Sequence, residues 1–231
     1  MSDYPRAIYI LHTRDYRESS LLLNLFSRDE GRVDAVLNGG KSKKWRGVAR
    51  EFSPLLAQWN GRSDLKTLTQ LEQASTPHPM IGNALFAGLY LNELLVRLLP
   101  AQQAHPELFD HYCVCLDALA EDVPLEPTLR QFELALLDEL GYQLDFACDC
   151  HGRPLSQQGW YRYSHQSGFV ACAPQEDGAL EGADLLAIGA AQWQNVSALR
   201  SAKRLVRIAL QPLLGDKPLR SRSLFAQGKS E

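Results

Sequence analysis

Residues 33–37, Val-Asp-Ala-Val-Leu, run into the turn Asn38-Gly39-Gly40 and are typical of a short β-strand. Similar runs precede and follow them. The five predicted strands cover residues 7–11, 21–26, 33–37, 55–59 and 65–71. Because a short antiparallel sheet avoids bare edges by closing on itself, these strands predict a small closed or nearly closed barrel. An OB-fold, which often binds oligonucleotides, is the expected form, and an SH3-like barrel also fits the pattern.

The segment between the third and fourth predicted strands is strongly basic. Residues 39–50 read Gly-Gly-Lys-Ser-Lys-Lys-Trp-Arg-Gly-Val-Ala-Arg, without an acidic residue. Cations bind phosphates and release counterions, and an exposed tryptophan gives a base a ring to stack on. The predicted DNA contacts here are Lys41, Lys43, Lys44, Trp45, Arg46 and Arg50. A solvated surface loop would have the same charge pattern. A P-loop is excluded, because Ala35 stands where its first glycine is needed.

Charge is unevenly distributed along the 231 residues, although the net charge is only −3. Residues 1–80 carry 12 Lys and Arg against 9 Asp and Glu, residues 81–195 carry 4 against 16, and residues 196–231 carry 8 against 2. Two basic ends around an acidic middle suggest one anion-binding surface to which both ends contribute.

The period becomes helical after the Pro-rich break at 76–79. Helices are predicted over residues 81–99, 107–119, 129–140, 183–191 and 195–214. Thr128 is the expected cap of the third helix, and Gly141 its stop.

The last predicted helix carries a second group of cations. Arg200, Lys203, Arg204 and Arg207 recur at helical spacing on one face, and no acid occurs between residues 196 and 215. We expect this face to contact phosphates, with an ordinary solvated face as the alternative.

A cysteine-rich segment lies between the helices. Zinc needs four N or S ligands, commonly supplied as two CxxC pairs. The candidate ligands are Cys148, Cys150, His151 and Cys172. Cys148 and His151 have the spacing of one pair, but Gln175 stands where a partner of Cys172 is needed. The pattern favours a degenerate site without bound zinc.

Recognisable catalytic motifs are absent, and the six histidines are scattered. Binding is therefore expected rather than catalysis. The N-terminus lacks the features of a signal peptide, and no apolar run has the length of a membrane span, so we expect a cytoplasmic protein. The expected DNA contacts would make it nucleoid-associated.

Several separated motifs, in this order, give the whole chain a resemblance to a known family. They are the basic-looped barrel, Gly-Leu-Tyr-Leu-Asn-Glu-Leu-Leu at 88–95, Leu-Arg-Gln-Phe-Glu at 129–133 and Lys-Pro-Leu-Arg-Ser-Arg at 217–222. Together they resemble RecO, the bacterial recombination mediator.

The resemblance implies an α+β chain with an N-terminal five-stranded OB-fold barrel and an α-helical bundle domain that carries a small zinc-finger-like β insert. The expected boundaries are 1–78 for the barrel, 79–145 for the helical domain, 146–178 for a degenerate insert, and 179–231 for helices that complete the helical domain, with a basic tail. The family's four insert cysteines are lost in some members, and His151 and Gln175 depart from them here.

The resemblance also implies an activity. RecO proteins bind single- and double-stranded DNA, anneal complementary strands, work with RecR and in some lineages with RecF, and help load RecA on strands coated by the single-stranded-DNA-binding protein, SSB. The acidic tail of SSB binds the helical domain in relatives, which implies a carboxylate contact at Arg130 beside Leu129 and Phe132. Those residues also allow Arg130 to be a helix-surface residue paired with Glu126 or Glu133.

Two other functions remain open from the residues. One is a non-catalytic adaptor whose basic ends bind acidic protein partners, and the other is a metal-dependent nuclease that uses the acidic middle.

Overall fold

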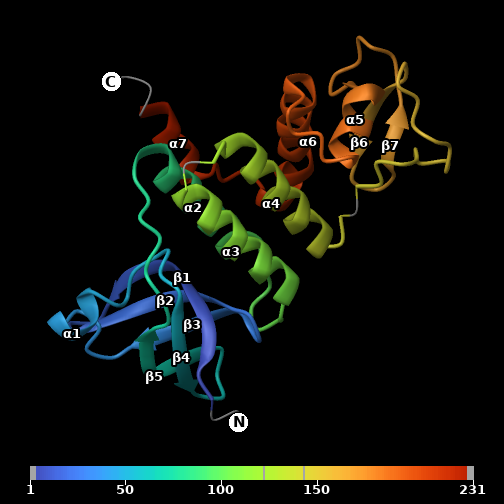
Figure 1. Cartoon of the computed structure of the whole chain (residues 1–231). Coiled ribbons are helices and arrows are strands. Elements are labelled where there is room, and N and C mark those ends of the chain that lie inside the picture. Colours follow the sequence, from blue (N-terminus) through green and yellow to red (C-terminus); the bar gives the residue numbers. More distant parts are fainter. Residues whose placement is uncertain (1–3, 122, 143, 228–231) are drawn as a thin grey trace. The chain divides into compact units, whose positions relative to one another are not determined.

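The computed structural model describes residues 4–121, 123–142 and 144–227 (Figure 1). They form two compact units, one containing the chain up to Val123 and again from Leu219, and one containing Pro124 to Pro218. Among the described residues, no helix combines the length and apolar character that crossing a membrane requires.

The first unit is built on a closed barrel of five strands (Figure 1). The strands are β1 (Arg6–Tyr16), β2 (Ser20–Ser27), β3 (Gly31–Leu37), β4 (Leu55–Asn60) and β5 (Leu65–Gln73). Their order is β1-β2-β3-β5-β4, and pairing of β4 with β1 closes the barrel. Only β3 and β5 pair in parallel. This barrel is of the OB type, as predicted.

Alternation along the strands fills the barrel. Residues two apart point to the same side of a strand, so Leu23 and Leu25 of β2 enter the core together with Val33 and Ala35 of β3. All five predicted strands are present. β1 runs beyond its predicted end to Tyr16, which pairs with Ser20 in a hairpin with β2. Its polar second half has no apolar pattern from which the extension could be predicted.

Two helices, α2 (Gly82–Leu98) and α3 (Pro106–Ala120), follow the barrel in the same unit. The Asn92 side chain joins helix and barrel, since its Nδ2 donates to the Leu11 carbonyl at 2.9 Å and its Oδ1 accepts from the Tyr112 hydroxyl at 2.5 Å. α2 contacts β1, α3 and the C-terminal helix α7 (Arg220–Gln227). Three neighbours explain why this helix is apolar almost all round.

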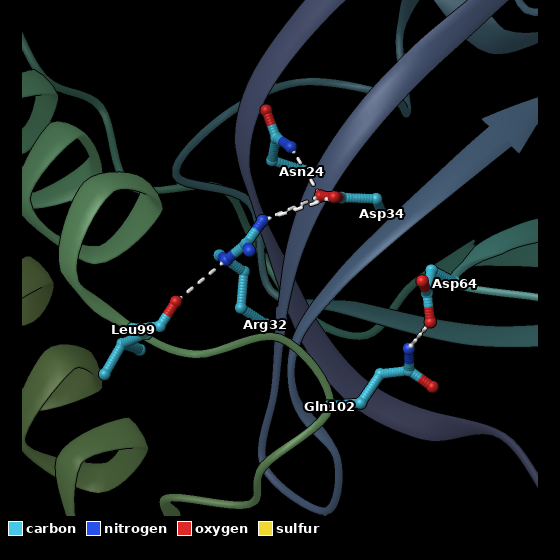
Figure 2. Close-up of polar contacts among 6 residues, drawn as sticks. All are labelled: Asn24, Arg32, Asp34, Asp64, Leu99 and Gln102. Carbon is cyan, nitrogen blue, oxygen red and sulfur yellow. Dashed lines mark hydrogen bonds and ion pairs between the residues drawn. The ribbon is translucent and has the colours of Figure 1, made fainter.

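The segment between α2 and α3 crosses the start of β3. Figure 2 shows Arg32 donating to the Leu99 carbonyl at 3.1 Å and to Asp34, whose carboxylate also accepts from Asn24. The backbone N–H of Gln102 donates to the Arg32 carbonyl at 2.8 Å. Gly31 has φ +67, and a Cβ there would lie 1.7 Å from the Gln103 carbonyl oxygen, so the close approach requires glycine. These contacts fix the helices to the barrel.

In its described residues, the second unit contains three helices and a small sheet. They are α4 (Leu125–Glu139), α5 (Gly182–Gly189), α6 (Val196–Leu214), and a sheet in the order β7-β6-β8 from β6 (Trp160–Ser164), β7 (Gly168–Ala171) and β8 (Leu180–Glu181). The Asn195 side chain caps α6 by accepting from the N–H groups of Ser197 and Ala198.

The predicted start of α4 was wrong. The helix begins at Leu125, and the hydroxyl of Thr128 donates to the Pro124 carbonyl inside the first turn. A proline can mark a break between helices, but Pro127 lies in the first turn of α4, where the N–H that proline lacks has no helical partner. Gly141, with φ +83, follows the end of the helix as predicted.

Candidate nucleic-acid interface

A short helix orients the basic segment of the first unit. Helix α1 (Lys43–Arg46) lies between β3 and β4, and Trp45, Val48 and Ala49 pack against the barrel core. The cations around this apolar anchor face solvent: Lys43, Lys44, Arg46 and Arg50 are exposed. The helix therefore separates a buried anchor from a charged surface.

Trp45 is not the exposed stacking ring that the sequence suggested. Its side chain is half-buried against the barrel core, and the ammonium of Lys44 lies 4.2 Å from the centre of its ring. The charges and glycines of this segment predict that all of it is exposed. In the helical turn, however, residues 45, 48 and 49 lie on one apolar face. Trp45 holds α1 on the barrel, and a cation occupies a face of its indole.

Lys41 joins the basic segment to the β1–β2 hairpin. Its Nζ lies 3.0 Å from the Asp15 carboxylate and donates to the Arg17 carbonyl at 3.2 Å. Its backbone N–H donates to the Ser19 carbonyl at 3.0 Å. The Lys41 ammonium is therefore not simply free to bind a phosphate, because it holds the basic segment against the β1–β2 hairpin.

This contact brings in residues that the sequence did not single out. Arg14 and Arg17 are exposed at the end of the hairpin, and Tyr16 between them is half-buried. The guanidinium of Arg17 lies 5.0 Å from the centre of the Tyr16 ring. The close spacing of Arg14, Tyr16 and Arg17 just before the second strand was a readable signal.

The second predicted group of cations lies on α6 in the second unit. Arg200, Lys203, Arg204 and Arg207 are all exposed, but they differ in their partners. Lys203 lies 3.0 Å from Glu126, and its ammonium lowers the pKa of that carboxyl. Arg204 donates to the Ala179 carbonyl at 3.0 Å. Two of the four thus also contact other residues of their own unit.

Arg130 on α4 is not the surface residue that the helical spacing suggested. Its side chain is only 9% exposed and pairs at 2.9 Å with Glu133, whose side chain is fully buried. Leu129 and Phe132 are buried as well. The predicted pairing with Glu133 is present, but it lies inside the unit, because neither side chain of the pair is more than 9% exposed.

The insert is organised by a carboxylate. Asp149 accepts from the backbone N–H groups of His151 and Arg153 at 2.9 and 3.0 Å, and pairs with the Arg153 guanidinium at 2.8 Å. The three candidate cysteines, Cys148, Cys150 and Cys172, are free thiols. Within the described ranges, no three His, Cys, Asp or Glu side chains are placed to share a metal ion, so the candidate ligands do not fit zinc here.

Two family models together match nearly the whole chain. The model "Recombination protein O N terminal" matches residues 1–77, and "Recombination protein O C terminal" matches residues 82–223. The chain belongs to the RecO family. The RecO N-terminal match ends after β5 and contains the basic segment and the hairpin, whereas the C-terminal match begins with α2 and contains Arg130, the cysteines and the α6 cations.

Individual RecO relatives agree with the family models. The chain is 46% identical to the DNA repair protein RecO of Pseudomonas paraeruginosa over 224 residues, which cover 97% of this chain and 95% of that protein. It is 48% identical to the protein of the same name from Stutzerimonas stutzeri over 217 residues, covering 94% and 91%. With the Haemophilus influenzae RecO the identity is 44% over 222 residues, covering 95% and 94%.

Proposed function

We propose that this RecO-family chain is a mediator of DNA repair and recombination that binds single- and double-stranded DNA without sequence preference. It anneals complementary strands and helps load RecA on DNA coated by SSB. The exposed cations around α1 carry the proposal, because their apolar anchor points them away from the barrel, as backbone binding requires.

Annealing needs no catalytic residue. Contacts to phosphates neutralise the repulsion between two strands and leave the base edges free to pair, and the DNA supplies the pairing energy. We therefore propose a non-catalytic protein that uses neither a nucleophile nor ATP. Lys43, Lys44, Arg46 and Arg50 are the principal phosphate contacts of the first unit, while Lys41 mainly positions the hairpin.

The α6 group is proposed as the phosphate-binding group of the second unit. Arg200 and Arg207 are assigned to DNA first, because Lys203 and Arg204 also serve Glu126 and Ala179. An exposed ion pair of the Lys203–Glu126 kind contributes little to stability, so a phosphate can replace Glu126 at small cost.

The SSB tail is proposed to bind through Arg130 beside Leu129 and Phe132, and because these side chains are buried, binding has to uncover them. A tail carboxylate would compete with Glu133 for the Arg130 guanidinium, which forms strong bidentate pairs with carboxylates. Family membership supports the further proposals that RecR, and RecF where it is present, are partners, and that the protein works in the cytoplasm at the nucleoid.

Strand annealing with and without SSB tests this function. Wild type should anneal unrelated pairs of complementary oligonucleotides equally well in both conditions. A variant with Lys43, Lys44 and Arg46 changed to Gln should fail in both. Arg130→Ala should fail only on coated strands. Glu133→Gln is its control, because it also removes the buried ion pair but keeps the guanidinium for the tail, so it should still anneal coated strands.

Three results would contradict the proposal. Failure of wild type to anneal bare strands would contradict the annealing activity, and annealing by the Gln variant equal to that of wild type would contradict the assigned site. Scission of labelled DNA in the presence of magnesium or manganese would identify a nuclease instead.

A further inference from the structure

We propose that Tyr16, at the end of the β1–β2 hairpin, is the residue on which an unpaired base stacks, and that it makes the barrel site prefer single-stranded to duplex DNA. The inference rests on the DNA binding proposed above. It adds the feature that distinguishes the two substrates, a role that the sequence had suggested for Trp45.

The two aromatic residues differ in how they are held. Trp45 packs against the barrel core and anchors α1. A base could therefore reach its indole only by lifting the ring from the core or by displacing the Lys44 ammonium. Tyr16 closes a two-stranded hairpin opposite Ser20, and the guanidinium of the exposed Arg17 lies over its half-buried ring, 5.0 Å from the ring centre. A movement of the Arg17 side chain would remove this contact from the ring.

Arg17 is held in an unusual backbone conformation. Its φ is +52, in the left-handed region that favours glycine. Lys41 stabilises this turn through hydrogen bonds to the carbonyls of Arg17 and Ser19. Such strain is retained where surrounding contacts enforce it, and here those contacts come from the basic segment. The turn and the phosphate-binding segment are therefore one structural element.

A base that stacks on Tyr16 would displace the Arg17 guanidinium from the ring. The released guanidinium could then pair with a phosphate of the same strand, so one cation–π contact is exchanged for a base stack and an ion pair. Bases inside a duplex are already stacked on one another and present no free face. Only an unpaired strand can make this exchange.

The charge of the hairpin separates this role from phosphate binding. Arg14 and Arg17 are accompanied by the acids Asp15 and Glu18, so the hairpin end adds no net charge. The preference should therefore come from the aromatic ring. Removing that ring should lower affinity for single strands while leaving the salt dependence, which counts phosphate contacts, unchanged.

The test compares Tyr16→Leu with its matched control, Tyr16→Phe, in the full chain. Affinities for a mixed-sequence oligonucleotide and for the corresponding duplex are measured at several salt concentrations. Tyr16→Leu should lower single-strand affinity by about fivefold or more and should leave duplex affinity and both salt slopes unchanged. Tyr16→Phe should match wild type in all of these measurements. An unchanged ratio of single-strand to duplex affinity in Tyr16→Leu would overturn the inference.

Two further measurements keep the result interpretable. If thermal unfolding shows that Tyr16→Leu is destabilised, Tyr16→Trp decides: its larger ring should raise single-strand affinity, and no change would overturn the inference. If wild type binds neither form of DNA, the proposed function fails as a whole. Wild type could bind DNA and lose affinity when the cations around α1 are changed, yet keep the same ratio of single-strand to duplex affinity in the Tyr16 variants. In that case only the stacking role fails.

Discussion

The Glu93 carboxylate on α2 caps the N-terminus of α7 at Ser221, 128 residues later in the chain. It accepts from the Ser221 N–H at 2.9 Å, from the Ser221 hydroxyl at 2.6 Å and from the Arg220 N–H at 2.9 Å. A carboxylate at a helix N-terminus satisfies N–H groups that have no helical partner and complements the helix dipole. This contact joins α7, which follows the second unit in the sequence, to α2 of the first unit.

Replacing Glu93 with Gln should loosen α7. The amide offers one acceptor oxygen and no charge, so we expect a loss of about 1 kcal/mol in the free energy of unfolding, a typical value for a lost cap. Hydrogen exchange should quicken at residues 220–224 and stay unchanged in β2. Arg97→Gln is the matched control, because it removes the guanidinium 3.8 Å from Glu93 and leaves in place the carboxylate that accepts from residues 220 and 221. Equal protection of residues 220–224 in Glu93→Gln and wild type would contradict this role.

The same contact predicts a pH dependence. Burial works to raise the pKa of Glu93, but hydrogen bonds from Ser221 and Arg220 outweigh it and hold the pKa below its ordinary value. A carboxyl with a lowered folded-state pKa stabilises the fold above its unfolded pKa, and this contribution is lost as pH falls through the folded pKa. The stability difference between wild type and Glu93→Gln should be constant from neutral pH to about pH 5 and shrink below about pH 4. A difference that grows on acidification would contradict it.

On α6, substitutions of the exposed arginines should differ in their effect on thermal stability. Arg200→Gln and Arg207→Gln should weaken DNA binding without changing Tm, because both side chains are exposed. Arg204→Gln should also lower stability, by about 1 kcal/mol, because Arg204 Nη1 donates to the Ala179 carbonyl. DNA titration and thermal unfolding of the three variants measure this. Identical effects on Tm would mean that the Ala179 contact contributes nothing.

In the insert, the carboxylate should matter more than the thiols. Asp149→Ala removes two hydrogen bonds to the backbone and the pair with Arg153, so it should lower Tm more than Arg153→Gln, which removes only the pair. A strong zinc chelator should leave Tm unchanged. A chelator-induced fall in Tm would show that zinc contributes to the fold after all.

Much of the fold could be predicted because its signals are local. Apolar alternation and glycine turns gave five strands, and Asn195 and Gly141 marked helix ends through the chemistry of their own side chain or backbone. The start of α4 was missed because Pro127 fits either a break or a first helical turn. Only the packing of the helix decides between them.

The candidate site was predictable in charge but not in burial. A run of cations is visible in the sequence, but whether Trp45 or Arg130 faces water depends on neighbours distant in the chain. Trp45 packs on a barrel core drawn from five strands, and Arg130 pairs inside its unit with Glu133. The role of Lys41 at Asp15 likewise follows from a contact between two loops that the strand order brings together.

The salt dependence of binding to single-stranded oligonucleotides tests the central claim, that the cations around α1 hold DNA by its phosphates. Wild type should bind two unrelated sequences with equal affinity. Changing Lys43, Lys44 and Arg46 to Gln should weaken both and lower the slope of log K against log salt by about 2, at roughly 0.7 per phosphate contact. Arg28→Gln, outside the segment, should leave the slope unchanged. A triple variant with the affinity and slope of wild type would contradict the account.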